Sequence, residues 1–120
     1  MLRPDASEYP HRYQRYIDLV PETDILSAFE VQCIKSRGFL KKIPESESQR
    51  QYTSNKWSIK EVVGHLIDVG RIFSLRILRF SRGDSRPRMD FDFDKTQYVQ
   101  RGLYNEARLS SLSAEFLWLR

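Results

Sequence analysis

The sequence predicts an all-α domain of three main helices preceded by an N-terminal aromatic arm. Two long segments and one shorter segment repeat apolar residues every three or four positions, the spacing of one helix face. Signals for helix starts and stops flank the best of these segments, and strand-like alternation is confined to a short stretch between turn residues. A chain of 120 residues is long enough for a single core, so we expect one domain over residues 1–120.

The arm comprises about the first 20 residues, in which three tyrosines stand among charges and prolines that do not suit a long helix. A helix over about residues 23–43 is predicted next. Proline and acidic residues precede it, as helix N-termini favour, and apolar residues then recur at helical spacing. Pro44 and a polar stretch end it, and Gly38 inside it costs about 1 kcal/mol relative to alanine.

The second predicted helix runs from Ser58 to about Arg82. Glu61 follows Ser58 at the spacing of a capping box, in which each side chain binds the other residue's backbone amide. Gly83 supplies a stop signal. Six apolar residues fall within one arc of about 80° at about 100° per residue, and this arc is the predicted core face. These residues are Val62, Leu66, Val69, Phe73, Ile77 and Phe80.

Residues 83–104 are expected to connect this helix to the third. Asp and Phe alternate over residues 90–94 as in a strand, but the turn residues on both sides favour a loop. The third helix is predicted to begin at Asn105, a suitable N-cap, and to continue to Arg120. Three helices of this type usually pack with a fourth, so the chain is expected to stop within the third helix of a larger bundle. The apolar face of the third helix comprises Leu109, Leu112, Phe116 and Leu119.

Composition limits the kind of protein. Apolar residues make up 40% and charged residues 30%, as in ordinary globular proteins. No apolar run is long enough to cross a membrane, and the N-terminus lacks the apolar core of a signal peptide, so we expect a cytoplasmic protein. Cys33 is the only cysteine, which excludes an internal disulfide and a multi-cysteine metal site.

The net charge of +4 is concentrated in residues 58–88, which carry seven basic and three acidic residues. Arg76 and Arg79 in this segment are candidates for binding an anion. The alternative is ion pairing with Asp84 or with the aspartates of residues 90–94, and this alternation of basic and acidic stretches favours pairing. A nucleic-acid surface is disfavoured, because no DNA-reading motif is present and aromatic residues are not interleaved with the arginines in an exposed pattern.

The segment from Trp57 to Asp68 contains the best-placed histidine. His65 has Glu61 four residues before it and Asp68 three residues after it, so both carboxylates can reach toward the imidazole. It lies about 80° from the centre of the apolar arc, a border position that faces a groove between helices. His65 is therefore either a groove histidine satisfied by these carboxylates or a metal ligand. Trp57 is either a substrate platform or a packing residue at the end of the bundle.

Three stretches together resemble the DinB-like superfamily, also called the YfiT-like metal-dependent hydrolases. The resemblance extends over nearly all of residues 9–120 and implies a four-helix bundle that binds a divalent metal, often Zn²⁺ or Ni²⁺, through three histidines. One of these corresponds to His65, and the other two form a His-x-x-x-His pair on the fourth helix. Relatives include thiol-dependent transferases, so a low-molecular-weight thiol and a small-molecule substrate are also implied. The stretches are Tyr16–Pro21, Lys56–Asp68 and Leu78–Asp84.

The sequence departs from the family at the metal site. Its only other histidine is His11 in the arm, whereas a catalytic zinc takes three protein ligands and an open position. We therefore expect His65 as a single metal ligand, with Asp68 and Glu61 as the carboxylates that orient it, in a chain that is incomplete as a catalyst. The alternative is a non-catalytic helical scaffold whose exposed apolar face drives formation of a homo-oligomer, most simply a dimer.

Overall fold

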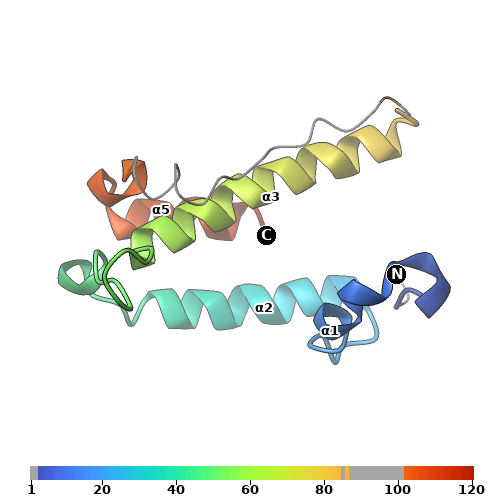
Figure 1. The fold of residues 1–120 in the computed structure, drawn as a ribbon, viewed down its shortest axis with the longest axis horizontal. Helices are drawn as coiled ribbons and strands as arrows, with labels where there is room; N and C mark the ends of the chain where they lie inside the picture. Colours follow the sequence, from blue (N-terminus) through green and yellow to red (C-terminus); the bar gives the residue numbers. More distant parts are fainter. Residues whose placement is uncertain (1–2, 85, 87–101) are drawn as a thin grey trace. The chain divides into compact units, whose positions relative to one another are not determined.

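The structure is a computed structural model that describes residues 3–84, 86 and 102–120 of the chain. Every regular element in this part is a helix, and its single β-bridge joins Gln51 to Ser58 (Figure 1). The all-α prediction is therefore confirmed. The chain divides into two compact units, Met1–Phe39 and Leu40–Arg120, which are described separately.

The first unit begins with short helical pieces in the residues for which an arm is predicted. Two 3₁₀ turns, η1 (Ala6–Glu8) and η2 (His11–Tyr13), precede the single-turn helix α1 (Gln14–Ile17). The longer helix α2 spans Ile25–Leu40. It ends three residues earlier than predicted, because the chain tightens into a turn in which the Ile43 amide donates to the Leu40 carbonyl.

The second unit is built on α3, which spans Ile59–Ser81. Ser58 is its N-cap and Gly83 has a φ of 67°, so the predicted start and stop signals are confirmed. A 3₁₀ turn, η3 (Glu45–Glu47), precedes α3 in this unit. Although α3 is 23 residues long, no helix among the described residues combines the length and apolar character that crossing a membrane requires.

The third predicted helix is divided in two. A 3₁₀ turn, η4 (Leu103–Glu106), comes first, and α5 (Leu109–Trp118) follows after two extended residues. The prediction of Asn105 as the N-cap is wrong, because Asn105 lies inside η4 and Arg108 precedes α5. Of the predicted apolar face, three residues are buried and Leu119 packs against them. The connector predicted over residues 83–104 lies mostly outside the described residues, as do the aspartates of residues 90–94.

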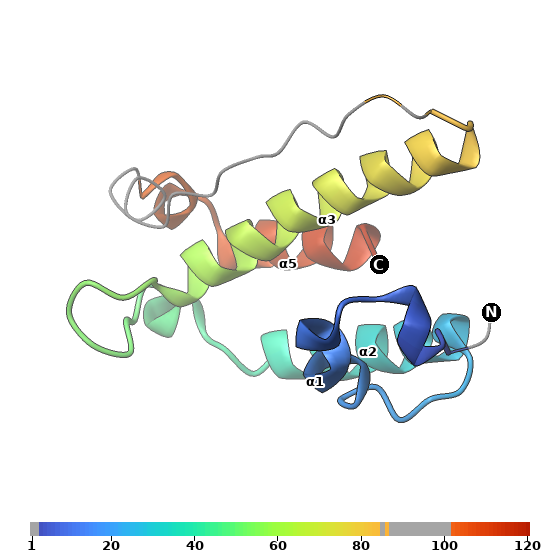
Figure 2. The same ribbon diagram turned by 45° about the vertical axis from the view of Figure 1, so that its right-hand side comes forward.

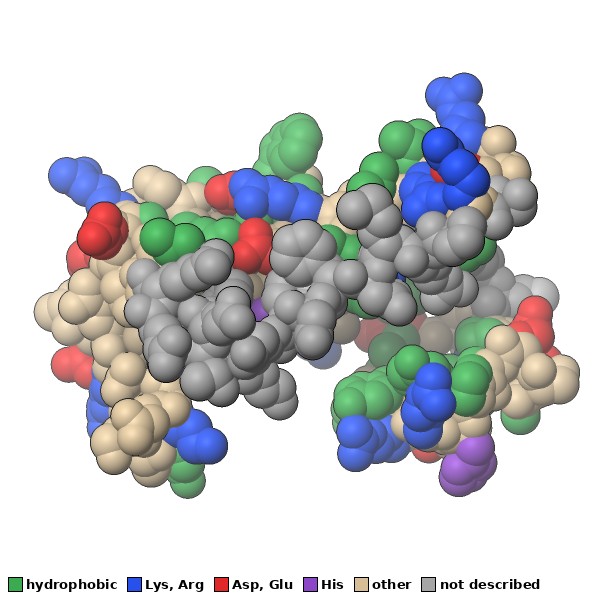
Figure 3. Space-filling model, turned by 45° about the horizontal axis from the view of Figure 1, so that its top comes forward, with side chains coloured by type: hydrophobic (Ala, Val, Ile, Leu, Met, Phe, Trp, Pro, Cys, Tyr) green, Lys and Arg blue, Asp and Glu red, His purple; other side chains and the backbone are tan. Residues whose placement is uncertain are grey.

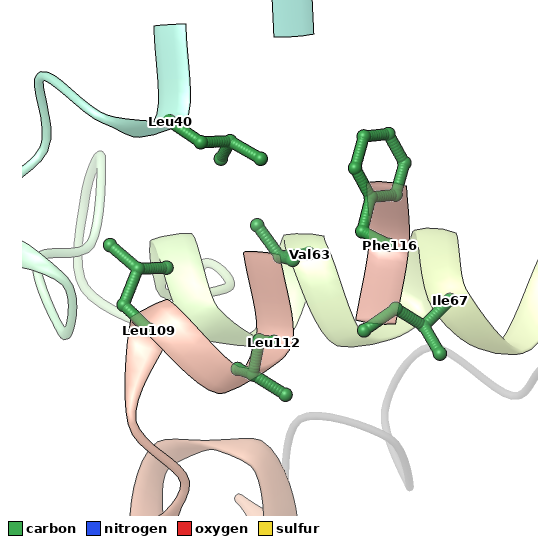
Figure 4. Close-up of a cluster of buried hydrophobic side chains, with 6 residues drawn as sticks. All are labelled: Leu40, Val63, Ile67, Leu109, Leu112 and Phe116. Atoms are coloured by element: carbon green, nitrogen blue, oxygen red, sulfur yellow. The ribbon is translucent and has the colours of Figure 1, made fainter. Parts of the chain in front are cut away.

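The core of the second unit lies between α3 and α5, which run side by side in both ribbon views (Figures 1 and 2). Val63 and Ile67 of α3 meet three residues of α5, and Leu40 at the end of α2 completes the cluster (Figure 4). Ile67 is fully buried. The three residues from α5 are Leu109, Leu112 and Phe116.

The predicted core face of α3 is wrong. In the structure Phe73 is 53% exposed and Ile77 67% exposed, and Val62, Leu66 and Phe80 are also exposed. The buried face lies about 100–140° around the helix from Val62. Because α5 is only ten residues long, it covers this other face along the N-terminal half of α3. Hydrophobic side chains are accordingly visible at the surface in Figure 3.

Candidate functional site

The site begins at the N-terminus of α3, where the capping box forms as predicted. The Ser58 hydroxyl accepts from the Glu61 amide at 3.1 Å, and the Glu61 carboxylate accepts from the Ser58 amide at 2.6 Å. Glu61 is only 2% exposed, so its carboxylate is dry and its bond to the amide is protected from water. The structure therefore places Glu61 in the cap of the helix.

A second polar contact joins this cap to η4. The Ser58 hydroxyl donates to the Asn105 side-chain oxygen at 2.6 Å, while the Asn105 carbonyl accepts from Gln49 at 2.8 Å and from the Lys60 ammonium at 3.3 Å. Asn105 thus receives three bonds from two separate segments of the chain. Its side-chain oxygen is bound to Ser58 and the residue lies inside η4, so Asn105 does not cap α5.

Glu45 takes over that capping role from a distance in the sequence. One of its oxygens lies 2.6 Å from the Lys60 ammonium, and the other accepts from the Leu109 amide at 2.8 Å. Lys60 is 4% exposed, so its charge is neutralised by Glu45 in a nearly dry environment. The Lys60 ammonium, and to a lesser degree the Leu109 amide, hold the pKa of Glu45 below its usual value.

His65 lies about two turns beyond the N-cap Ser58, one turn after Glu61, and packs against Trp57. The two ring centroids are 4.7 Å apart with the planes tilted by 58°, and the Nδ1 atom of His65 is buried. Trp57 is therefore a packing partner of the candidate histidine, on the residue just before the cap. This contact restrains the imidazole on one side.

Tyr104 lies over the backbone of α3 at the residue before His65. A Cβ atom built on Gly64 would lie well under 3.0 Å from three atoms of the Tyr104 ring, so the ring occupies the space that the missing side chain leaves. The Tyr104 hydroxyl donates to Asp68 at 2.7 Å. Burial, followed by this hydrogen bond, raises the pKa of Tyr104 to about 12, so the phenol keeps its proton near neutral pH.

Asp68 therefore belongs to a chain of polar contacts between α3 and α5. Besides Tyr104, it accepts from the Arg71 guanidinium at 3.3 Å, and Arg71 also pairs with Glu115 of α5. This ion pair is partly exposed, with half of the Arg71 side chain accessible to water. The carboxylate expected to orient His65 thus binds Tyr104 of η4 and Arg71 of α3, and Arg71 links it to α5.

Of the two candidate anion-binding arginines, Arg79 pairs within the chain. Its Nε lies 2.7 Å from Asp84, which Arg86 also binds at 2.8 Å. Arg86, and then Arg79, lower the pKa of Asp84 far below its usual range. The prediction of an internal ion pair is confirmed for Arg79. Arg76 is placed with its guanidinium 5.6 Å from the centre of the Phe73 ring, a cation–π contact.

The described side chains do not fit a complete metal centre. Within the described ranges, no group of three or more His, Cys, Asp or Glu residues is placed to hold a metal ion. His65 is the one imidazole in the second unit, because His11 belongs to η2 in the first. Its flanking carboxylates, Glu61 and Asp68, are bound to the Ser58 amide and to Tyr104. The first of these bonds caps α3, and the second attaches η4 to α3 on the other side of His65.

The sequence pattern did not indicate three residues that define this site, namely Glu45, Lys60 and Tyr104. Lys60 stands seven residues before Ile67, so the two share one side of α3, and the correct core face would have indicated a buried lysine. Gly64 inside a helix is the signal for a close neighbour, although it does not identify Tyr104. Nothing local in the sequence around Glu45 indicates a cap for α5.

The comparison with protein families gives a match over residues 29–117, most of the chain, to the DinB superfamily. Comparisons with curated proteins and with solved structures gave no significant match. The matched range contains α3, α5 and the whole His65 region. The chain therefore belongs to the DinB superfamily.

Proposed function

We propose that the described part of this chain serves as a helical scaffold and is not by itself a catalyst. The observation that carries the proposal is the state of the two carboxylates beside His65. Glu61 is bound to the Ser58 amide at 2.6 Å and Asp68 to the Tyr104 hydroxyl at 2.7 Å, and both bonds hold the fold together. A reaction that recruited either carboxylate would have to share that group with a contact on which the fold relies.

The family resemblance implies a divalent metal, Zn²⁺ or Ni²⁺, in a hydrolase or thiol-dependent transferase. A catalytic zinc takes three protein ligands. In the proposal, His65 offers one such ligand, and any metal-dependent activity, with or without a thiol, requires further donors from outside the described residues. The burial of Nδ1 and the contact with Trp57 support His65 as a restrained single ligand.

A metal titration tests the scaffold proposal. The 120-residue chain is titrated with Zn²⁺ or Ni²⁺ in competition with a coloured chelator, alongside His65→Gln and the control His11→Gln. We expect no one-to-one complex that survives the competition, and the same result for all three proteins. A one-to-one complex that His65→Gln abolishes and His11→Gln retains would overturn the proposal in favour of a metal centre.

We also propose that the scaffold self-associates as a homodimer. The supporting observation is the exposed apolar stripe on α3, on which Phe73 and Ile77 are each more than half exposed. Contiguous exposed apolar surface of this kind commonly marks an interaction site. Light scattering over a range of concentrations should show a dimer that the double variant Phe73→Gln/Ile77→Gln converts to a monomer. A parent protein that stays monomeric at every concentration would contradict this proposal.

A further inference from the structure

We infer that Gly64 and Asp68 form a seat for Tyr104, and that this seat keeps η4 and α5 on α3. The inference rests on the proposed scaffold role and gives these two residues, which flank His65, a task in the fold. It differs from the expectation that Asp68 mainly orients a metal-binding imidazole. Three features support it: the missing side chain at Gly64, the hydrogen bond that Asp68 accepts, and the position of Tyr104 just before α5.

The shape of the seat comes from the absence of a side chain at Gly64. The atoms nearest to a Cβ built there are Cγ, Cδ2 and Cε2 of Tyr104, all closer than real Cβ contacts allow. The ring therefore lies directly on the helix backbone. Gly64 is itself buried, in part under this ring, although a glycine inside a helix costs about 1 kcal/mol relative to alanine. Contact with Tyr104 explains why a glycine is suited to this position.

The polar end of the seat is Asp68, one turn further along α3. Its Oδ1 atom accepts from the Tyr104 hydroxyl at 2.7 Å and from Arg71 at 3.3 Å. A bond from a neutral donor to a carboxylate is stronger than one between neutral groups. Because burial and this hydrogen bond raise the pKa of Tyr104 to about 12, its hydroxyl keeps its proton and remains a donor near neutral pH.

The seat acts on α5 because Tyr104 stands five residues before that helix begins. Asn105, the next residue, is bound to Ser58, and Glu115 of α5 pairs with Arg71, which also donates to Asp68. The chain entering α5 is thus attached at Tyr104, and α5 itself is attached through the same carboxylate cluster. Removing the contacts of Tyr104 with this seat should therefore destabilise α5 before it destabilises α3.

The test uses the full 120-residue chain and measures amide hydrogen exchange over residues 109–118. The variants are Tyr104→Phe, Asp68→Asn and the two combined, and the control is Tyr52→Phe, since Tyr52 is 92% exposed. Tyr104→Phe should raise exchange in α5 about tenfold, the size expected for losing one charged hydrogen bond, and Asp68→Asn should raise it by a smaller factor, because the amide oxygen still accepts a neutral bond. The double variant should exceed Tyr104→Phe by little, because without the Tyr104 hydroxyl the change at residue 68 has no Tyr104 bond left to weaken. The control should match the parent.

A second measurement distinguishes an Asp68 that holds Tyr104 from an Asp68 that orients the His65 imidazole. The ¹⁵N signals of the His65 ring are recorded in the same proteins without metal. If exchange in α5 is unchanged while Asp68→Asn alone moves the His65 signals, the inference is overturned, because Asp68 then serves His65. A metal complex that depends on His65 would overturn the scaffold proposal but leave the exchange results standing, so the two failures are distinguishable.

Discussion

Glu45 binds Lys60 through one carboxylate oxygen, 2.6 Å from the ammonium, while its other oxygen accepts from the amide that opens α5. The two ends of this ion pair differ in their surroundings. The Lys60 side chain is 5% exposed, whereas that of Glu45 is 54% exposed. Glu45 therefore neutralises a buried charge from the surface and at the same time fixes the start of a helix.

The first prediction concerns the asymmetry of this pair. Glu45→Gln should destabilise the protein more than Lys60→Met, because the first leaves a buried ammonium without its anion and the second leaves a carboxylate that water can solvate. The midpoints of urea unfolding followed by circular dichroism give the ranking. Glu47→Gln is the control, since Glu47 lies on the same turn in an exposed pair with Arg50 and should change little. Equal losses of stability for Glu45→Gln and Lys60→Met would contradict the prediction.

The second prediction is the pH dependence of the same contact. Lys60 first, and then the Leu109 amide, lower the pKa of Glu45 from its usual 4.5. A lowered pKa in the folded state gives stability that is present above the unfolded value and is lost as the pH falls through the folded value. The difference in unfolding free energy between the parent and Glu45→Gln should therefore shrink below about pH 4.5. A difference that stays constant from pH 7 to about 3 would count against it.

The third prediction compares two glycines inside helices. Gly64→Ala should lower the stability by about 1–3 kcal/mol, because the new methyl group meets the Tyr104 ring. Gly38→Ala should instead raise it by about 0.5–1 kcal/mol, because a Cβ there has no neighbour within 4 Å. The two variants make the same chemical change, so helix propensity alone predicts the same sign for both. Urea unfolding of both variants decides between propensity and contact.

Local sequence signals located α3 well and its buried face poorly. Ser58, Glu61 and Gly83 act within one turn of the helix ends, so their effects can be derived from the sequence alone. The face depends on what packs against it. The apolar stripe from Val62 to Phe80 contains more residues than the buried apolar face of α3, yet α5 packs on the face that carries Val63 and Ile67.

Local signals likewise identified only those parts of the site that lie on one helix. His65, Glu61 and Asp68 were found because they lie within two turns of one helix. Tyr104 is 36 residues from Asp68, and Glu45 is 64 residues from the Leu109 amide that it caps. Such pairings depend on how η3, η4 and α5 fold back onto α3. Periodicity along the chain carries no information about them.

The last prediction tests the corrected core face of α3 directly. Ile67→Ala should cost about 2–4 kcal/mol, because Ile67 is fully buried between α3 and α5 and its removal leaves a cavity. Ile77→Ala, ten positions along the same helix, should cost far less at a concentration where the protein is monomeric, because that side chain is 67% exposed. Both variants delete the same atoms from the same helix, so their difference reports burial alone. If Ile77→Ala proved as costly as Ile67→Ala in the monomer, the stripe from Val62 to Phe80 would have to be covered in solution, and the assigned core face would be wrong.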